Sequence, residues 1–344
     1  MNIKVYKISQ LHIIEEEWKR LEKGKDMTFF QTFEWNKCLV TQFKRLIFRR
    51  LYRTLKYVVL YDDDGNVICI APLRIKRLVK KRTIVRCIEL LGADSFSDYV
   101  NLIYDSCYEE GFSTMMEYIF KRWKKYSIDW RSIPKDSLFA DFLINYYKDN
   151  TLDFRKCVYI PVEKKDYYSE LSKNTRQNFR TSCNRMQRDG LSFRWEIVNI
   201  IDEDSLIDKL LEINLERTIE KNSHRFTNRV SVIKEKIRLR YLSIIRIIMG
   251  NSEYAWSLIA YLNDDIAGFL TGAYYKDKVY VMMNKVSPQY EFYSPMIVAS
   301  IQYIGELCQS DSDIKIVDFG RGTESYKYRL GGEEADLIKF SYNL

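Results

Sequence analysis

The residues best suited to chemistry lie near the end of the chain, between Asp318 and Gly332. The stretch reads DFGRGTESYKYRLGG and follows a short apolar run that predicts a buried strand. Its ionisable groups are carboxylates, a phenol, an ammonium and a guanidinium, from Asp318, Glu324, Tyr326, Lys327 and Arg329. Glycines at 320, 322, 331 and 332 predict bends or a close approach of the backbone. These groups could move protons or hold an anion, although solvated charges on a glycine-rich turn have the same composition.

The composition is that of a folded chain with ample core material. Of the 344 residues, 46% are hydrophobic and 30% are charged, and the length favours two domains. The net charge of +8 favours anionic partners such as cofactor phosphates, an anionic sugar, a lipid headgroup or RNA. DNA is not among the partners we expect.

The apolar runs, cysteines and histidines of the sequence bear on the compartment of the protein and on metal binding. The first residues, MNIKVYKISQ, lack the apolar core of a signal peptide, and no apolar run reaches the ~18 residues needed to cross a bilayer. Seven scattered cysteines form no CxxC pair, which predicts reduced thiols in the cytoplasm. With two histidines in the chain, we expect no metal centre.

Strand and helix patterns alternate along the whole chain and predict an α/β (α+β) fold. In the second half, strands are expected at 157–162, 193–198 and 255–283, and helices at 173–188, 204–221, about 230–249 and from Pro295. The first half has helices expected at 10–23, 111–125 and 137–148 and a hairpin at 57–73. The segments LYDDDGNVICIAPL and AYLNDDIAGFLTGA echo each other about 200 residues apart, which suggests two copies of one unit.

Two basic segments have more than one interpretation. Residues 43–56 form a basic amphipathic pattern, which fits either an anionic membrane surface or a solvated helix face over a core. The expected helix 173–188 carries Arg176 and Arg180 among other basic residues. It could contact the phosphates of a cofactor, bind an anionic acceptor or be a solvated face.

Five segments in order resemble a known family: FFQTFEWN, LLGADSFSDYVNLI, LSKNTRQNFRTSCNRMQRDG, YSPMIVASIQYI and DFGRGTESYKYRLGG. The chain resembles the CelD/BioF2-like acyltransferases of the GNAT superfamily, which are related to the Fem peptidoglycan aminoacyltransferases. The resemblance covers nearly the whole chain and depends on the order and spacing of the segments. It implies two tandem GNAT-like domains, each a mixed sheet flanked by helices. Residues 1–155 would be a degenerate copy and residues 156–344 the acyltransferase domain.

The resemblance also implies a place for an acyl-CoA co-substrate, most simply acetyl-CoA, with no metal. In this family the acyl-CoA lies between separating strands, and its pyrophosphate meets backbone N–H groups at a helix N-terminus. The matching cofactor-binding residues are Tyr293, Ser294, Met296, Ile297 and Val298. The chain departs from the usual glycine-rich loop here, and Pro295 has no N–H to donate.

We expect direct acyl transfer without a covalent enzyme intermediate. Asp318 and Glu324 are the candidate bases for the acceptor proton, and Tyr326 could protonate the leaving thiolate. Lys327 resembles the lysine of the Fem-type YK/FK segment and could hold a donor phosphate or polarise the carbonyl. The candidate substrate-binding residues are Arg176, Arg180 and Arg321.

Three functions remain open from the sequence. The first is acyl transfer to a sugar, nucleotide-sugar or lipid-linked sugar precursor, in surface polysaccharide synthesis in the cytoplasm or at the inner face of the membrane. The second is a Fem-like reaction that uses aminoacyl-tRNA and a peptidoglycan precursor, which the net charge of +8 also fits. The third is a degenerate scaffold that binds a ligand or partner without catalysis.

Overall fold

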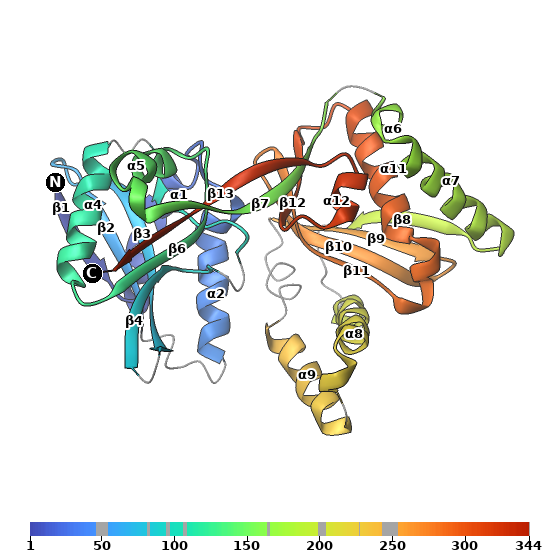
Figure 1. Cartoon of the computed structure of the whole chain (residues 1–344), viewed down its shortest axis with the longest axis horizontal. Coiled ribbons are helices and arrows are strands. Elements are labelled where there is room, and N and C mark those ends of the chain that lie inside the picture. The colour runs from blue at the N-terminus through green and yellow to red at the C-terminus, as the bar shows by residue number, and fades with distance from the viewer. Residues whose placement is uncertain are drawn as a thin grey trace. The chain divides into compact units, whose positions relative to one another are not determined.

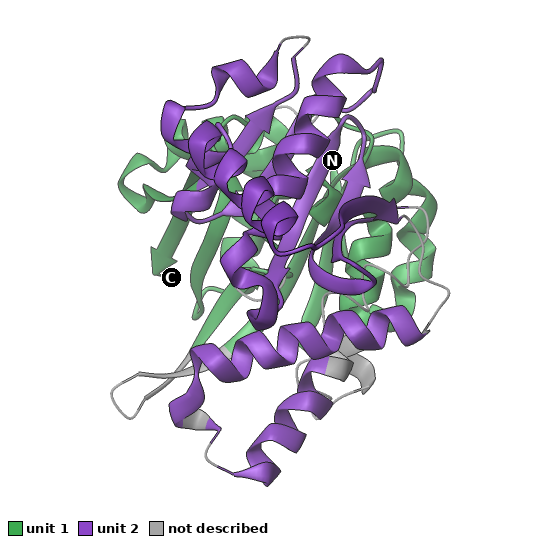
Figure 2. Cartoon of the chain, turned by 90° about the vertical axis from the view of Figure 1, so that its right-hand side faces the viewer, with its two compact units in different colours: residues 1–156, 335–344 green, residues 157–334 purple. Residues whose placement is uncertain are grey.

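The structure, a computed structural model, describes residues 1–45, 54–80, 83–93, 97–105, 109–163, 166–198, 204–226, 228–242 and 254–343. The chain divides into two compact units (Figure 2). Unit 1 comprises Met1–Lys156 and Ala335–Leu344, and unit 2 comprises Cys157–Glu334. The sequence predicts a second domain of residues 156–344, whereas residues 335–344 cluster with unit 1. Their strand pairs with a strand of that unit, which explains the difference.

Unit 1 is a sheet with helices packed against it. Its strands are β1 (Asn2–Tyr6), β2 (Leu55–Tyr61), β3 (Val67–Lys80), β4 (Thr83–Leu90), β5 (Ile103–Tyr104), β6 (Ser127–Pro134) and most of β13 (Glu333–Asn343). Its helices are α1 (Glu15–Leu21), α2 (Phe33–Arg45), α4 (Glu109–Arg122) and α5 (Leu138–Tyr146), with 3-10 turns at Ile8–Ile14, Phe29–Gln31 and Lys148–Asn150. The core of this unit is rich in aromatic residues, including Trp18, Phe112 and Trp130.

Unit 2 has helices on both faces of its sheet. Strand β7 (Thr151–Pro161) crosses the boundary, with its residues up to Lys156 in unit 1 and the rest in unit 2. The other strands of unit 2 are β8 (Phe193–Val198), β9 (Ala255–Leu262), β10 (Asp265–Tyr275), β11 (Lys278–Val286) and β12 (Ile316–Arg321). Its helices are α6 (Tyr167–Glu170), α7 (Lys173–Arg188), α8 (Asp204–Lys221), α9 (Arg229–Leu242), α11 (Pro295–Gln309) and α12 (Ser325–Arg329), with 3-10 turns at Ser223–Arg225 and Pro288–Tyr293. Figure 1 shows α6, α7 and α11 on one side of β9–β11 and α8 and α9 on the other.

The two units have the same sheet topology. The strand order is β1-β2-β3-β4-β6-β13 in unit 1 and β8-β9-β10-β11-β12-β7 in unit 2. In each unit the fourth and fifth strands are parallel. Each of the other neighbouring pairs is antiparallel. The expectation of two copies of one mixed α/β unit is therefore confirmed, because an unrelated fold would not repeat this order and these directions.

Local sequence signals explain where α7 of unit 2 begins and ends. The backbone N–H of Thr175 donates to the Ser172 hydroxyl at 3.1 Å, which caps the start of α7. Gly190 ends the helix with a φ of +68°, a conformation that suits glycine. The apolar face predicted for this helix is also present, because Thr175 and Met186 are buried and Phe179 is half-buried. The predicted ranges of α7 and α8 are confirmed.

Other expected helices differ from the structure. Residues 10–23 do not form one helix, since Ile8–Ile14 is a 3-10 turn that precedes α1. The expected basic helix 43–56 is not continuous either: residues 43–45 end α2, residues 46–53 lie outside the described residues, and β2 begins at Leu55. The alternating pattern at the end of that segment belongs to the strand hairpin that follows it.

Candidate functional site

The parallel strands β11 and β12 pair only near their starts. Pairing runs from Lys278 with Ile316 to Tyr280 with Asp318. Beyond this point β11 continues to Val286 and β12 to Arg321, and no further pairs between these described strands are present. Separation of adjacent strands exposes backbone groups and opens a place where a ligand can lie between them.

Asp318 lies at the point where the two strands separate. Its side chain is 8% exposed. Val317 and Phe319 pack in the core beside α11, so Asp318 lies on the opposite face of the sheet, against which α8 packs. Its neighbours across the ladders are tyrosines on both sides, Tyr280 on β11 and Tyr159 on β7. The sequence offers no sign of this tyrosine–aspartate–tyrosine row, because the three residues are far apart along the chain.

A bulge directly after Asp318 uses the glycines of the motif. The Asp318 Oδ1 atom accepts a hydrogen bond from the Gly320 N–H at 2.7 Å, and the register shifts between Asp318 and Arg321. Gly320, Gly322 and Gly331 have φ values of +64°, +102° and +80°. The expectation of sharp bends at these glycines is confirmed, and they are conformations that side chains with a Cβ avoid.

The ammonium of Lys327 sits inside the loop that the motif forms. The side chain is 2% exposed although it is charged. Its Nζ contacts the carbonyl oxygens of Gly320, Arg321 and Gly322 at 3.3, 2.9 and 3.1 Å. It also pairs with Glu324 at 2.9 Å. In this arrangement the donors of Lys327 are used to fold the loop around it, so the residue positions the segment that follows Asp318.

Glu324 is held in its ionised form by this pairing. Partial burial favours the neutral acid, but the hydrogen bond from Lys327 and its charge keep the pKa of Glu324 below the ordinary value of 4.5. Its side chain is 57% exposed. A carboxylate with a lowered pKa is a weak general base at neutral pH, which counts against Glu324 in that role.

Tyr326 lies apart from Asp318 on the sheet. It is half-buried and its ring stands edge-on to Phe319, with 6.0 Å between the ring centres. Both residues belong to the cluster on the α11 side of the sheet. The structure therefore brings Tyr326 to the core side of the strand, while Asp318 faces the opposite side.

The N-terminus of α11 offers few backbone donors. Pro295 has no N–H, and the N–H groups of Ile297 and Val298 donate to the Ser294 carbonyl at 3.1 and 3.2 Å. Met296 has no backbone acceptor among the described residues, but its side chain, like that of Val298, is packed in the core. The expected cofactor-binding residues thus supply little more than one N–H to a pyrophosphate, and the fit of acyl-CoA depends more on the separated strands.

The arginines expected to bind substrate have contacts within their own region. Arg176 donates to the Ser169 carbonyl, and the Nε of Arg180 lies 3.2 Å from the Tyr168 hydroxyl. Arg185, farther along α7, reaches the segment before α11. Its guanidinium lies 4.4 Å from the centre of the Phe292 ring and donates to the Phe292 carbonyl at 3.3 Å. Arg185 lies more than two helical turns beyond Arg176. The sequence alone could not show that this turn of α7 faces the segment before α11.

A group of cations lies on the α8 side of the sheet and was not predicted. Lys285 is opposite Phe269 in the β10–β11 ladder, and Phe269 packs against α8. Burial, followed by the charges of Lys221 and Arg217, lowers the pKa of Lys285. Arg217 on α8 donates to Glu291 at 2.6 Å. Arg217 also pairs with Glu220, so two carboxylates accompany the three cations of this region.

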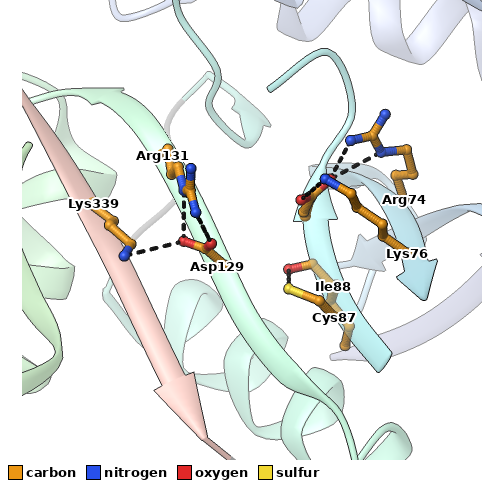
Figure 3. Close-up of polar contacts among 8 residues, drawn as sticks. Arg74, Lys76, Cys87, Ile88, Asp129, Arg131 and Lys339 are labelled. Atoms are coloured by element: carbon orange, nitrogen blue, oxygen red, sulfur yellow. Dashed lines mark hydrogen bonds and ion pairs between the residues drawn. The ribbon is translucent and has the colours of Figure 1, made fainter. Parts of the chain in front are cut away.

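Unit 1 has an aspartate at the corresponding position. Asp129 lies two residues beyond Ser127, where parallel pairing with β4 begins, just as Asp318 lies two residues beyond Ile316 in unit 2. Figure 3 shows Asp129 between Arg131 and Lys339, whose nitrogens lie 3.0 and 3.6 Å from its Oδ1 atom. Partial burial opposes ionisation, but these cations hold the pKa of Asp129 below its ordinary value.

A second ion pair occupies the neighbouring strands of unit 1. Glu89 on β4 is 5% exposed and accepts a hydrogen bond from the Arg74 Nε at 3.0 Å. Lys76 reaches its other oxygen at 3.2 Å, as Figure 3 shows for the two cations. By the same register, Glu89 corresponds to Tyr280 of unit 2. The two units thus share a backbone arrangement and differ in charge at equivalent positions.

The described residues contain neither a cluster of potential metal ligands nor a membrane-spanning helix. No group of three or more His, Cys, Asp or Glu side chains in this part of the chain gathers as a metal site would. No described helix is both long enough and apolar enough to span a bilayer.

Comparison with known proteins agrees with this arrangement. Residues 173–328, all within unit 2, match the family model described as "Acetyltransferase (GNAT) domain". No curated protein sequence matches the chain. Unit 2 therefore carries a GNAT domain, which supports an acyltransferase. The narrower CelD/BioF2 group remains a prediction.

Solved structures with this fold match over the full length. The structure of FemX has a TM-score of 0.60 and 12% identity, with 100% of this chain and 98% of that chain covered. A conserved protein of unknown function from Bacteroides thetaiotaomicron has a TM-score of 0.53 and 9% identity, with both chains fully covered. A tandem GNAT protein from the clavulanic acid biosynthesis pathway has a TM-score of 0.50 and 10% identity, covering 99% of this chain and 98% of that one. At these identities the similarity shows the fold of two tandem GNAT-like domains.

Proposed function

We propose that unit 2 transfers an acyl group, in the simplest case acetyl, from acyl-CoA to an amine or hydroxyl group of a small sugar-type precursor. The observation that carries the proposal is the separation of β11 from β12 directly after Asp318, inside the stretch that matches a GNAT domain. The acceptor class that we propose is a sugar, nucleotide-sugar or lipid-linked sugar used in surface polysaccharide synthesis, and the net charge of +8 suits an acceptor that carries an anionic group.

In the proposed reaction the acceptor nitrogen or oxygen attacks the thioester carbonyl and forms a new bond to its carbon. Asp318 takes the proton that the acceptor loses. When the tetrahedral intermediate collapses, the carbon–sulfur bond breaks and the thiolate of CoA takes a proton from solvent, because Tyr326 lies on the side of β12 opposite Asp318. Lys327 acts as a positioning residue, because its contacts fix the bulge beside Asp318.

We propose that unit 1 is not a second catalytic centre. Asp129, which corresponds to Asp318, is neutralised by Arg131 and Lys339. A carboxylate held by two cations is a poor proton acceptor. Glu89 replaces the tyrosine that borders Asp318 in unit 2, and Arg74 fills the space beside it. These features support the interpretation of unit 1 as the degenerate copy.

A second candidate donor is aminoacyl-tRNA. The observation that favours it is the α11 N-terminus, where Pro295 and the internal bonds of Ile297 and Val298 leave little for a pyrophosphate to meet. The net charge of +8 fits RNA as well as it fits a nucleotide. The acceptor would then be a peptidoglycan precursor.

Thermal shift measurements distinguish the two donors. The full chain is heated with CoA, acetyl-CoA, succinyl-CoA and a long-chain acyl-CoA, and separately with charged and uncharged tRNA. A ligand at ~100 times its dissociation constant stabilises the native state by about 2.7 kcal/mol. We expect one acyl-CoA to raise the melting temperature. A shift with charged tRNA alone would move the proposal to the second donor, and no shift with any of these ligands would contradict both.

Single-turnover transfer then tests the base. With the donor identified, Asp318→Asn should reduce the transfer rate by about 10²- to 10⁴-fold while donor binding persists. Asp129→Asn, at the equivalent position of unit 1, is the matched control and should leave the rate unchanged. A rate that falls equally in both variants would overturn the assignment of catalysis to unit 2.

A further inference from the structure

Helix α9 has a second apolar face that does not point to the protein core. Its inner residues, Val232 and Leu239, are half-buried, and Leu239 lines a cavity together with Leu211 and Leu215 of α8. On the outer side, Val230, Ile233 and Ile237 are 59%, 48% and 52% exposed. Their spacing of three and four residues aligns them along one face of the helix. Large apolar side chains this exposed are a small minority in the described chain, and three of them gather here.

Basic residues border this apolar face on both sides. The helical period places Lys234 and Arg238 along one edge and Arg229 and Lys236 along the other. All four are exposed; Arg238 is paired with Glu235, and Lys236 also lines the cavity beside α8. The single acidic residue of α9, Glu235, is turned inward and accepts a hydrogen bond from the Arg238 Nε at 2.8 Å. Over Arg229–Leu242 there are five basic residues and one acidic residue, a net charge of +4.

An apolar face with cations along both edges matches an anionic lipid surface. Apolar side chains of an interfacial helix enter the boundary between headgroups and acyl chains, while lysine and arginine side chains reach the phosphates. A protein partner with a hydrophobic groove would meet the apolar residues but would need matching acids along both edges. A second copy of this chain would bring two surfaces of the same positive sign together, which opposes association.

We propose that the outer face of α9, defined by Val230, Ile233, Ile237 and the four bordering cations, binds the surface of an anionic membrane. Figure 1 shows α8 and α9 on the same side of the unit 2 sheet. The inference is independent of the acyl donor and acceptor proposed above. It differs from the membrane interpretation of residues 43–56, which fall largely outside the described residues.

Vesicle flotation with the full chain tests this proposal. The probes are vesicles of phosphatidylcholine alone and vesicles that also contain phosphatidylglycerol. We expect binding to the anionic vesicles only, with loss of binding at high salt. Replacing Lys234 and Lys236 by Gln should weaken binding about fivefold for each charge removed. The double variant Ile233→Asp, Ile237→Asp should bind at least tenfold more weakly, since it places two carboxylates where side chains enter the lipid.

A matched control distinguishes binding through this face from nonspecific hydrophobic binding to vesicles. Leu138 on α5 of unit 1 is 51% exposed, so Leu138→Asp changes an apolar side chain of similar exposure elsewhere. This variant should bind vesicles as the unchanged protein does. The melting temperatures of all variants should stay close to that of the unchanged protein. The proposal is overturned if the full chain ignores anionic vesicles or if the Ile233/Ile237 variant binds them normally. It is equally overturned if sedimentation shows a dimer that this double variant abolishes.

Discussion

Replacing Lys327 by Met removes the ammonium and keeps most of the aliphatic stem. Three carbonyl oxygens, from Gly320, Arg321 and Gly322, then lose their donor. A buried acceptor left without a donor costs about 1 to 3 kcal/mol. Because Arg321 and Gly322 are half-buried, water can reach two of the three, and we expect a total loss of about 2 to 4 kcal/mol. For a unit of this size the melting temperature should fall by about 4 to 15 °C.

Calorimetry and hydrogen exchange measure this effect. Calorimetry gives the unfolding transition of unit 2, and exchange of the amides of residues 316–332 reports whether the loop opens locally. Lys315→Met is the control, since Lys315 is exposed just before β12. Donor binding is measured on the same samples.

The reasoning would be refuted by a Lys327→Met protein with normal stability and normal loop exchange that fails to bind the donor. That result would assign Lys327 the direct role expected from the sequence, in which it holds a donor phosphate or polarises the carbonyl. Reduced stability together with faster loop exchange would support the positioning role derived from its contacts.

Three further predictions concern individual groups. Gly322→Ala should destabilise unit 2 by about 1 to 3 kcal/mol in urea unfolding, because φ is +102° and a Cβ would lie 2.7 Å from the Glu324 carboxylate; an unchanged midpoint would contradict this. Glu324 has a lower pKa when folded than its ordinary 4.5, so the stability it adds relative to Glu324→Gln should be full at neutral pH and vanish as pH falls through the lowered pKa. Melting curves between about pH 3 and 7 check the sign. Glu89→Gln should cost unit 1 about 3 to 5 kcal/mol by leaving the buried Arg74 without its anion, whereas exposed Glu16→Gln should cost almost nothing.

Much of the helical structure of unit 2 follows from local signals. The range of α7 could be predicted because Ser172 caps its start, an apolar residue recurs every three to four positions, and Gly190 ends it. The helix expected over residues 10–23 is wrong because its local pattern fits more than one type of helix. Its apolar residues fit a helical face, but the chain forms a 3-10 turn at Ile8–Ile14 before α1, and periodicity alone does not separate these two helix types.

The sequence located the motif of the candidate site and could not supply its geometry. Glycines 320 and 322 predicted bends, yet nothing in their order shows that three successive carbonyls turn toward Lys327. The neighbours of Asp318 depend on the register of β7 and β11. A register is fixed by packing of whole strands, so a partner many residues away cannot be read from composition or spacing.

The duplication offers an internal comparison that a single domain lacks. Asp129 and Asp318 occupy the same place in two sheets of one topology, so the side chains around them can be compared directly. In unit 1, Arg131 and Lys339 stabilise the carboxylate as an anion, whereas tyrosines border it in unit 2. Because the cations of unit 1 lower the pKa of Asp129, they make this carboxylate a weaker proton acceptor than an ordinary aspartate. The neighbours of an aspartate can thus change its basicity in one copy of a duplicated fold, even though the aspartate itself is retained.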